Sequence, residues 1–357
     1  MDILRPLLLR AVTLFGVLIA VLVLLAASLG ATGFSDRILE ATVNEEIRGL
    51  RSSLAGSIRD PDELERTLQT RAAELRASYG LDRPWWVRIP GLVTRVLTLD
   101  LGDARSIRSY SGSTRIADII LERLPNTILL LTTSTILVAL IGIAAGVWLS
   151  TRIGSRIDRF ITYLAAISNA LPTWWLGILL ILLFTYRLGW LPSEGMYSVP
   201  PPEGGWPRFL DLLRHSVLPV MTLVLVSIGP SIYSVRTLTL NIAQEDHVNV
   251  ARAKGMPERV VLWRHILRVA APPIVTGLIL GLAGSLGGSI LVETIFNWSG
   301  MGRLYYDAIA GTPDEGLIVA LTFMFTLIYV LARLLLEFLY LVLDPRVRYE
   351  EAVGRPA

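Results

Sequence analysis

Long apolar segments occupy most of this chain, and they restrict its fold more than any other feature. The first of them, Ala11–Ser35, is uncharged and long enough, at about 1.5 Å per helical residue, to cross a hydrocarbon core of about 30 Å. Because unpaired backbone groups are costly in lipid, such segments cross a membrane as helices. The sequence therefore predicts an all-α, polytopic membrane protein with six transmembrane helices. The predicted spans are Ala11–Ser35, Thr127–Ser150, Phe160–Tyr186, Val217–Val235, Ala270–Val292 and Leu317–Leu343.

The composition agrees with a membrane location and excludes several classes of function. Of the 357 residues, 53% are hydrophobic and 18% are charged, and the mean hydropathy is +0.56. Lys254 is the only lysine and is followed by Gly-Met, so the chain has no Walker-A loop of an ATPase. The absence of cysteine excludes disulfides, thiolate metal sites and cysteine nucleophiles. The histidines at 215, 247 and 265 form no HExxH pair, so we expect neither a metal site nor catalytic residues here.

The positions of the arginines predict the orientation of the spans. Arg5 and Arg10 precede the first span, and a short turn after the second contains Arg152, Arg156 and Arg159. Basic residues in short connections lie in the cytoplasm under the positive-inside rule. Because the number of predicted spans is even, both the N-terminus and the C-terminus are expected in the cytoplasm.

Prolines mark where we expect the helices to begin, bend or end. Leu124-Pro125-Asn126 leads into the second span, and Leu171-Pro172 predicts a kink within the third. A loop rich in proline and glycine, from Gly189 to His215, is expected on the outer side before the fourth span. In the sixth span, Arg333 and Glu337 are four residues apart and are able to pair. Charges within a span can mark a pathway, but we favour a structural or interfacial ion pair near the cytoplasmic end.

Residues 36–121 form the only long polar segment, and because it follows the first span we expect it outside the cytoplasm. Within it, Asp60-Pro61-Asp62-Glu63 is typical of a helix start, with a capping residue, a proline in the first turn and acids near the positive end of the dipole. We divide the chain into an N-terminal region with the first span (1–35), an extracytoplasmic segment (36–121), a transmembrane domain (122–343) and a cytoplasmic tail (344–357).

The stretch Gln244–Pro273 is the most polar interruption in the second half of the chain. Glu245–Ala253 contains few helix breakers, and Gly255 is suited to the left-handed conformation that ends a helix. Pro257 is suited to the first turn of a second helix, and the pair Pro272-Pro273 is expected to end it. The sequence therefore predicts a cytoplasmic helix–turn–helix. A basic loop held near anionic lipid would have a similar composition.

Several motifs in this chain resemble those of ABC-importer membrane subunits, most closely the peptide/nickel permeases. ARAKG at Ala251–Gly255, followed by RHILR and the proline pair, resembles their coupling loop. The departures are Ala104 and Ser299, where the family usually has glycine and proline, and GTPDEG at Gly311–Gly316. The resemblance covers roughly residues 80–348. Its other motifs are Gly80–Trp86 (GLDRPWW), Leu101–Ser106 (LGDARS), Glu122–Leu130 (ERLPNTILL), Gly189–Pro192 (GWLP), Glu293–Gly302 (ETIFNWSGMG) and Asp344–Arg346 (DPR).

This resemblance implies the type I ABC importer permease fold and a transport subunit that is not itself an enzyme. The implied partners are a second homologous permease subunit, two ABC ATPase subunits, an extracytoplasmic substrate-binding protein and the lipid bilayer, with no nucleic acid. ATP and magnesium would bind to the ATPase subunits, so this chain itself would carry no cofactor. The implied location is the inner or plasma membrane of a prokaryotic cell. The expected substrate is a dipeptide or oligopeptide, with nickel or oligosaccharides as alternatives.

The resemblance also indicates which residues would contact the ATPase and which would line the pathway. Ala251 and Ala253 would keep the loop small enough for a groove on the ATPase, and Arg252 and Lys254 would donate hydrogen bonds to it. The complete set of expected coupling residues is Glu245, Ala251, Arg252, Ala253, Lys254, Gly255, Met256, Pro257, Arg264 and His265. Residues expected along the pathway are Glu293, Phe296, Trp298, Gly300 and Gly302.

Glycines in the fifth span suggest a further contact. Gly277 and Gly281, with Gly284 or Gly288, lie near one helical face, where small residues let another helix approach closely. That helix can belong to this subunit or to a partner.

The competing functions are an ATP-independent secondary carrier or channel, a membrane enzyme, and a scaffold or receptor. Nearly uncharged spans and a docking loop favour the importer over a carrier or channel. The chain lacks the paired carboxylates, HExxH pair or nucleophile motif of a membrane enzyme. A scaffold or receptor stays open, because sequence does not show turnover.

Overall fold

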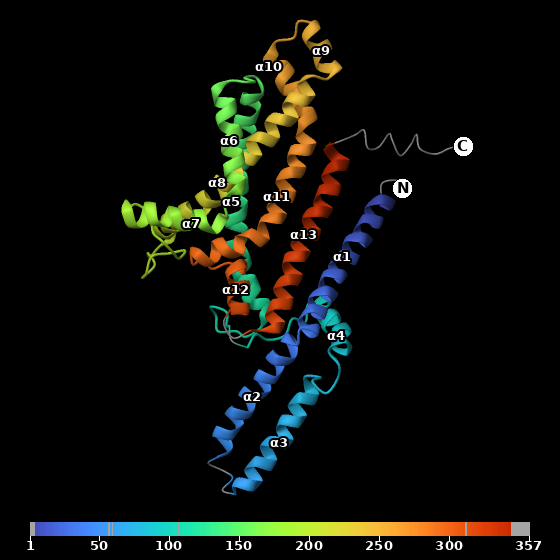
Figure 1. Ribbon diagram of the computed structural model, residues 1–357, viewed down its shortest axis with the longest axis vertical. Helices are drawn as coiled ribbons and strands as arrows, with labels where there is room; N and C mark the ends of the chain where they lie inside the picture. The colour runs from blue at the N-terminus through green and yellow to red at the C-terminus, as the bar shows by residue number, and fades with distance from the viewer. Residues whose placement is uncertain (1–3, 56–57, 59, 106, 311–312, 344–357) are drawn as a thin grey trace, which may run out of the picture. The chain divides into compact units, whose positions relative to one another are not determined.

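The structure is a computed structural model that describes residues 4–55, 58, 60–105, 107–310 and 313–343 (Figure 1). These residues form helices and no strand, which confirms the predicted all-α class. The α-helices are α1 Leu4–Ala31, α2 Phe34–Leu54, α3 Pro61–Ser78, α4 Trp85–Leu97, α5 Ile116–Ser150, α6 Arg156–Ala170, α7 Thr173–Leu180, α8 Gly205–Ala243, α9 Asp246–Ala253, α10 Glu258–Val260, α11 Arg268–Ile295, α12 Met301–Ala310 and α13 Glu315–Leu343. Two π-helical segments, Ile181–Arg187 and Val261–Leu267, follow α7 and α10.

Among the described residues, five helices are long and apolar enough to cross a membrane. They contain α1, α5, α8, α11 and α13, and the bent pair of α6 and α7 makes a sixth if it counts as one span. The chain is therefore an integral membrane protein.

Arg333 and Glu337 are half-buried on α13, and their pairing stays a prediction. The DPR motif, the predicted tail, Ser106 and the first two residues of GTPDEG lie outside the described residues.

The third predicted span is broken rather than kinked. Helices α6 and α7 meet at an angle of 102°, and α7 projects sideways from α6 in Figure 1. Leu171, at the break, is extended with φ −79° and ψ 123°. A residue before proline is pushed out of the helical region by the proline ring, so Pro172 breaks the helix where only a kink was predicted.

Other prolines lie inside continuous helices, and for the pair Pro272-Pro273 this contradicts the prediction. Helix α5 begins at Ile116 and continues through Pro125, and α8 begins at Gly205 and continues through Pro219 and Pro230. Helix α11 continues through Pro272-Pro273, so this pair does not end a helix as predicted. Each proline removes one backbone hydrogen bond, whereas ending a helix in lipid would leave several groups unpaired. The apolar surroundings therefore favour continuous helices.

The chain divides into two compact units, and the larger consists mainly of Arg123–Tyr306. In this unit, α6 and α8 pack closely because glycine removes a side chain at their contact: a Cβ on Gly229 would lie 2.6 Å from the Ala165 Cα. The same pair of helices is joined by a buried ion pair, in which Arg236 Nη2 lies 2.7 Å from Asp158 Oδ2. The Gly154 amide donates to the same carboxylate at 2.9 Å.

The other unit contains Leu8–Glu122 and Asp307–Leu327. Its helices α2 and α3 lie side by side and antiparallel (Figure 1), joined by Arg51–Glu65 at 2.8 Å and Tyr79–Glu46 at 2.7 Å. A third link, from Arg76 Nε to Glu40, measures 3.0 Å, and this hydrogen bond lowers the pKa of the Glu40 carboxyl. Helix α3 starts as predicted, with Asp60 accepting from the Asp62 amide at 3.0 Å.

Candidate coupling elbow and membrane cavity

The predicted helix–turn–helix is present, and we call residues 245–267 the elbow. Helix α9 begins after Glu245, which occupies the N-cap position with an extended backbone. Gly255 has φ +73°, the left-handed conformation predicted for it, and Pro257 immediately precedes α10. In Figure 1 the elbow stands at one end of α8 and α11, which lead into and out of it.

The inner face of the elbow is part of the hydrophobic core. Val248 and Ala251 pack in one hydrophobic cluster with Val235 and Ile242 of α8 and Val147 of α5. The other buried residues of this cluster are Val261, Ile266, Ala270 and Ile274. Because Ala251 is only 3% exposed, it faces the helix bundle and not a partner, contrary to its predicted place at the docking tip. The elbow therefore packs against the ends of three long helices, α5, α8 and α11.

Arg252 joins the two helical limbs of the elbow, which are α9 on one side of the turn and α10 with the π-helical segment on the other. Its guanidinium makes a two-point contact with Glu258, with Nη2–Oε1 at 2.8 Å and Nε–Oε2 at 3.3 Å. The hydrogen bond that Arg252 donates to Glu258 raises the pKa of Arg252. Nη1 also donates to the Ala243 carbonyl at the end of α8, at 3.1 Å. These donors are thus occupied inside the elbow, whereas the sequence predicted that they would serve a partner.

The outer face of the elbow combines apolar and basic side chains. The exposed apolar residues are Val250, Met256, Val260 and Trp263, of which Trp263 is 64% exposed. Ala253, Lys254 and Arg264 are also exposed, and His265 is half-buried. The limbs are further joined by His247, whose Nε2 lies 3.2 Å from the His265 carbonyl oxygen. The elbow also exposes the acidic side chains of Glu245, Asp246 and Glu258, so its surface is apolar and of mixed charge.

The residues predicted to line the pathway instead form a buried cluster. Glu293 is fully buried; its Oε1 accepts from Thr127 at 2.9 Å and its Oε2 from the Arg303 amide at 3.0 Å. Thr127 Oγ1 in turn accepts from the Met301 amide at 2.8 Å. We call Glu293, Thr127 and the two amides the Glu293 knot. It ties α5 to α11 and α12.

The ERLPNT and ETIFNWSGMG motifs meet in and around this knot. Trp298 Nε1 donates to the Asn126 carbonyl at 3.0 Å, and Asn126 Nδ2 donates to the Ser299 carbonyl at 2.6 Å. Phe296 is buried, and its ring would lie 3.1 Å from a Cβ on Gly177 of α7. Glu293, Phe296 and Trp298 therefore pack the fold, and none of them lines the cavity described below.

Gly300 and Gly302 are also buried, and their small size has a structural reason. A Cβ on Gly300 would approach Thr127 Oγ1 to 2.5 Å, and a Cβ on Gly302 would lie 2.8 Å from the Ile290 Cα. Neither glycine lines the cavity. Both let α12 pack against α5 and α11.

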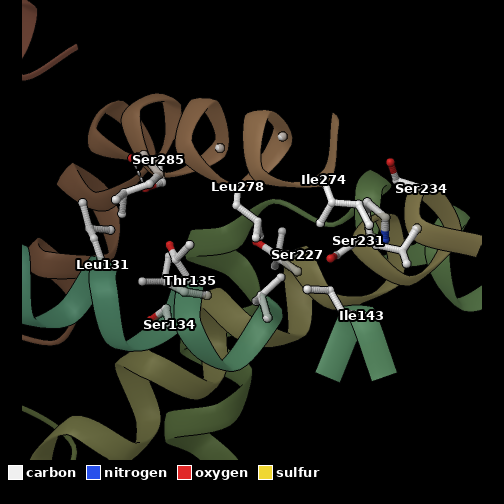
Figure 2. A pocket seen from close by; sticks show the side chains of 18 of the residues that line it. Leu131, Ser134, Thr135, Ile143, Ser227, Ser231, Ser234, Ile274, Leu278 and Ser285 are labelled. Atoms are coloured by element: carbon white, nitrogen blue, oxygen red, sulfur yellow. Dashed lines mark hydrogen bonds between the residues drawn. The ribbon is translucent and has the colours of Figure 1, made fainter. Parts of the chain in front are cut away.

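A cavity of about 420 Å³ lies between α5, α6, α8 and α11 (Figure 2). Its residues are apolar or neutral and polar, and no described lining residue is ionisable. The polar ones are Ser134, Thr135, Asn169, Ser227, Ser231, Ser234 and Ser285. Sequence reasoning overlooked these residues, although the spacing of Ser227, Ser231 and Ser234 on α8 places them on one helical face.

The glycines of α11 border the cavity or open space. Gly277 and Gly281 line the cavity, and a Cβ on either, or on Gly284 or Gly287, would meet no described atom within 4 Å. The close helix approach predicted for this face is therefore not made by the described part of this chain.

Comparison with known proteins assigns the family. Residues 139–349 match the family described as binding-protein-dependent transport system inner membrane component. Oligopeptide transport system permease protein AppB of Bacillus subtilis is 34% identical over 271 residues, covering 76% of this chain and 83% of that protein. A putative peptide transport system permease protein of Brucella abortus is 33% identical over 302 residues (83% and 88%). Glutathione transport system permease protein GsiC of Salmonella paratyphi A is 33% identical over 283 residues (78% and 84%). The chain belongs to the family of binding-protein-dependent transport system inner membrane components.

Proposed function

We propose that this chain is the permease subunit of an ATP-driven ABC importer and forms half of a translocation pathway for dipeptides or oligopeptides. The observation that carries this proposal is the shared core of elbow and cavity walls. Val248 and Ala251 of the elbow pack in the same cluster as Val147, Val235 and Ile274, on three helices that enclose the cavity. Because packed interiors transmit displacement, a force on the elbow would move the cavity walls. The names of the relatives support peptides as the substrate.

The remaining parts of the transporter would be other chains. A second homologous permease would complete the pathway, two ABC ATPase subunits would bind ATP and magnesium, and an extracytoplasmic binding protein would deliver the substrate. The exposed outer face of the elbow would dock on an ATPase subunit. The arginine distribution favours an inner-membrane protein with both termini in the cytoplasm.

The cavity also bears on the rival functions. An ion-coupled secondary carrier commonly places ionisable residues within its spans, whereas the described lining of this cavity has none. Nickel would require metal-ligating side chains, and the described residues contain no group of three His, Cys, Asp or Glu that can hold a metal. Both observations favour an uncharged or zwitterionic organic substrate over an ion.

Purification and reconstitution test the proposal directly. We expect the tagged chain to co-purify in mild detergent with a second permease and Walker-motif ATPase subunits. In proteoliposomes with the binding protein, ATP should drive peptide accumulation, and peptide should stimulate ATP hydrolysis. A chain that purifies alone and moves solute without ATP would overturn the proposal and favour a secondary carrier.

Replacing Gly255 with valine should uncouple ATP hydrolysis from transport while membrane insertion is retained. A β-branched residue at φ +73° is strained by roughly 1–2 kcal/mol, and this strain would distort the turn between α9 and α10. Gly255→Asn is the matched control, because asparagine tolerates the left-handed conformation. The measurement is peptide uptake per ATP hydrolysed. Normal coupling in the valine variant would contradict the role of the elbow.

Arg252→Ala and Lys254→Ala should differ in their effects. Loss of Arg252 removes the contacts to Glu258 and Ala243, so we expect faster proteolysis at the elbow together with weaker ATPase association. Lys254 is exposed, so its loss should weaken association alone, by about 0.5–1 kcal/mol. Limited proteolysis and co-purification measure the two effects. Equal proteolysis rates in both variants would show that Arg252 does not brace the elbow.

A further inference from the structure

The cavity has two chemically different walls. On one side α5 and α8 contribute hydroxyl groups, among them Thr135, Ser227 and Ser231; on the other, Ile274 and Leu278 of α11 point toward them (Figure 2). Gly277 and Gly281 lie on the α11 side and keep space open, since a Cβ at either would meet no described atom within 4 Å. The α5 and α8 side therefore carries hydroxyls among apolar residues such as Val138 and Leu238. The α11 side is mainly apolar, because its Ser285 hydroxyl donates to the Leu282 carbonyl at 2.7 Å.

The hydroxyls of the polar wall are available to a ligand. Elsewhere in these helices, serine and threonine commonly donate to a carbonyl one turn earlier, as Thr132 does to Ile128 at 2.6 Å and Thr222 to Leu218 at 2.8 Å. Within the described chain, the side chains of Thr135, Ser227, Ser231 and Ser234 make no such bond, nor any other hydrogen bond between described residues. Ser231 also packs against Gly142 of α5 through its hydroxyl oxygen. A hydroxyl without a protein partner can donate to and accept from a bound molecule.

Pro230 adds a backbone acceptor to the same wall. A proline has no N–H, so the carbonyl four residues earlier, at Val226, loses its helical donor. Val226 and Pro230 both line the cavity, as do Ser227 and Ser231. A peptide main chain needs an alternation of donors and acceptors, and the hydroxyls and this carbonyl supply both.

We propose that the cavity binds the main chain of a short peptide along the hydroxyl wall of α5 and α8 and holds its side chains against the apolar wall of α11, with preference for uncharged side chains. This inference rests on the proposed function as a peptide permease. Hydrogen bonding to the main chain does not depend on peptide sequence. The apolar wall has no counter-charge for a lysine or aspartate side chain, so a charged side chain would lose hydration without compensation. The cavity volume of about 420 Å³ lies within the range of small-ligand sites.

The hydroxyl wall is tested with the complete complex in proteoliposomes. The double variant Ser227→Ala/Ser231→Ala should lower peptide uptake about 4- to 100-fold, because each lost hydrogen bond between neutral groups lowers binding about two- to tenfold. Ser216→Ala is the matched control on the same helix; its hydroxyl donates to the Leu213 carbonyl and it does not line the cavity. Uptake by the double variant within twofold of the control would overturn the proposal.

The open space on α11 provides a second test that does not depend on hydrogen bonding. Gly281→Leu should extend a side chain into the cavity and lower uptake at least tenfold, with the complex still assembled, because a Cβ at this position would meet no described atom within 4 Å. Gly287→Leu lies on the same helix, is equally unobstructed and does not line the cavity, so it should transport normally. Equal uptake by the two leucine variants would show that peptide does not pass through this cavity.

Side-chain preference is measured as a ratio, so that the contribution of the binding protein cancels. Uptake of Ala-Leu-Ala and Ala-Lys-Ala is compared in the wild type and in Leu278→Asp, which places a carboxylate on the apolar wall. We expect the lysine-to-leucine ratio to rise about tenfold or more in the variant. An unchanged ratio would overturn the assignment of that wall to side chains. If the wild-type complex hydrolyses ATP and takes up neither peptide, the proposed function itself fails.

Discussion

Replacing Asp158 with alanine is expected to lower the free energy of unfolding by about 3–5 kcal/mol, because it leaves a buried arginine without its counter-charge. The Asp158 and Arg236 side chains are 6% and 15% exposed, so solvent screens their interaction weakly. The change also removes the acceptor of the Gly154 amide, which lies 2.9 Å from the carboxylate. Thermal and denaturant unfolding of the purified complex in detergent measure the effect.

Two further variants distinguish the effect of an unpaired buried charge from a nonspecific loss of stability. Asp246→Ala removes an exposed acid from the first turn of α9 and should cost no more than about 1 kcal/mol. The double variant Asp158→Leu/Arg236→Leu should recover part of the lost stability, since an apolar pair of similar volume commonly replaces a buried ion pair at little cost. A double variant less stable than Asp158→Ala would contradict this explanation.

The second large effect is expected for Glu293→Ala, which removes the centre of the Glu293 knot. The Thr127 hydroxyl and the Arg303 amide would both lose a buried acceptor, at about 1–3 kcal/mol each, and the missing side chain would leave a void. We expect unfolding at markedly lower temperature and poor recovery of the complex. Glu293→Gln keeps one carbonyl oxygen of the same size and should therefore lie between the alanine variant and the wild type.

Thr294→Ala provides the control for the knot. Thr294 follows Glu293 on α11, and its hydroxyl donates only to the Ile290 carbonyl of its own helix at 2.7 Å. Its loss should change stability by less than about 1 kcal/mol. A Glu293→Ala complex as stable as Thr294→Ala would show that the knot does not hold the helices together.

The membrane class and the elbow were predictable because they depend on local properties. The apolar spans are recognisable from length and composition, and lipid requires them to be helical. Gly255, Pro257 and Asp60 set the backbone around themselves, so their positive φ, helix start and N-cap followed from residue type alone. The helix ends were predicted less well. The tendency of Pro125 and Pro272 to interrupt a helix competes with an apolar environment that favours unbroken helices.

By itself, therefore, the sequence determined an all-α membrane protein with a helix–turn–helix between its fourth and fifth spans. The tertiary structure decided which residues meet. It placed Ala251 inside the core, paired Arg252 with Glu258, buried Glu293 beside Thr127, and brought the hydroxyls of α8 opposite Leu278. These contacts join residues up to 166 positions apart. Periodicity assigns a residue to a face of its own helix, but only the packing of helices against one another decides whether that face meets protein, a cavity or lipid.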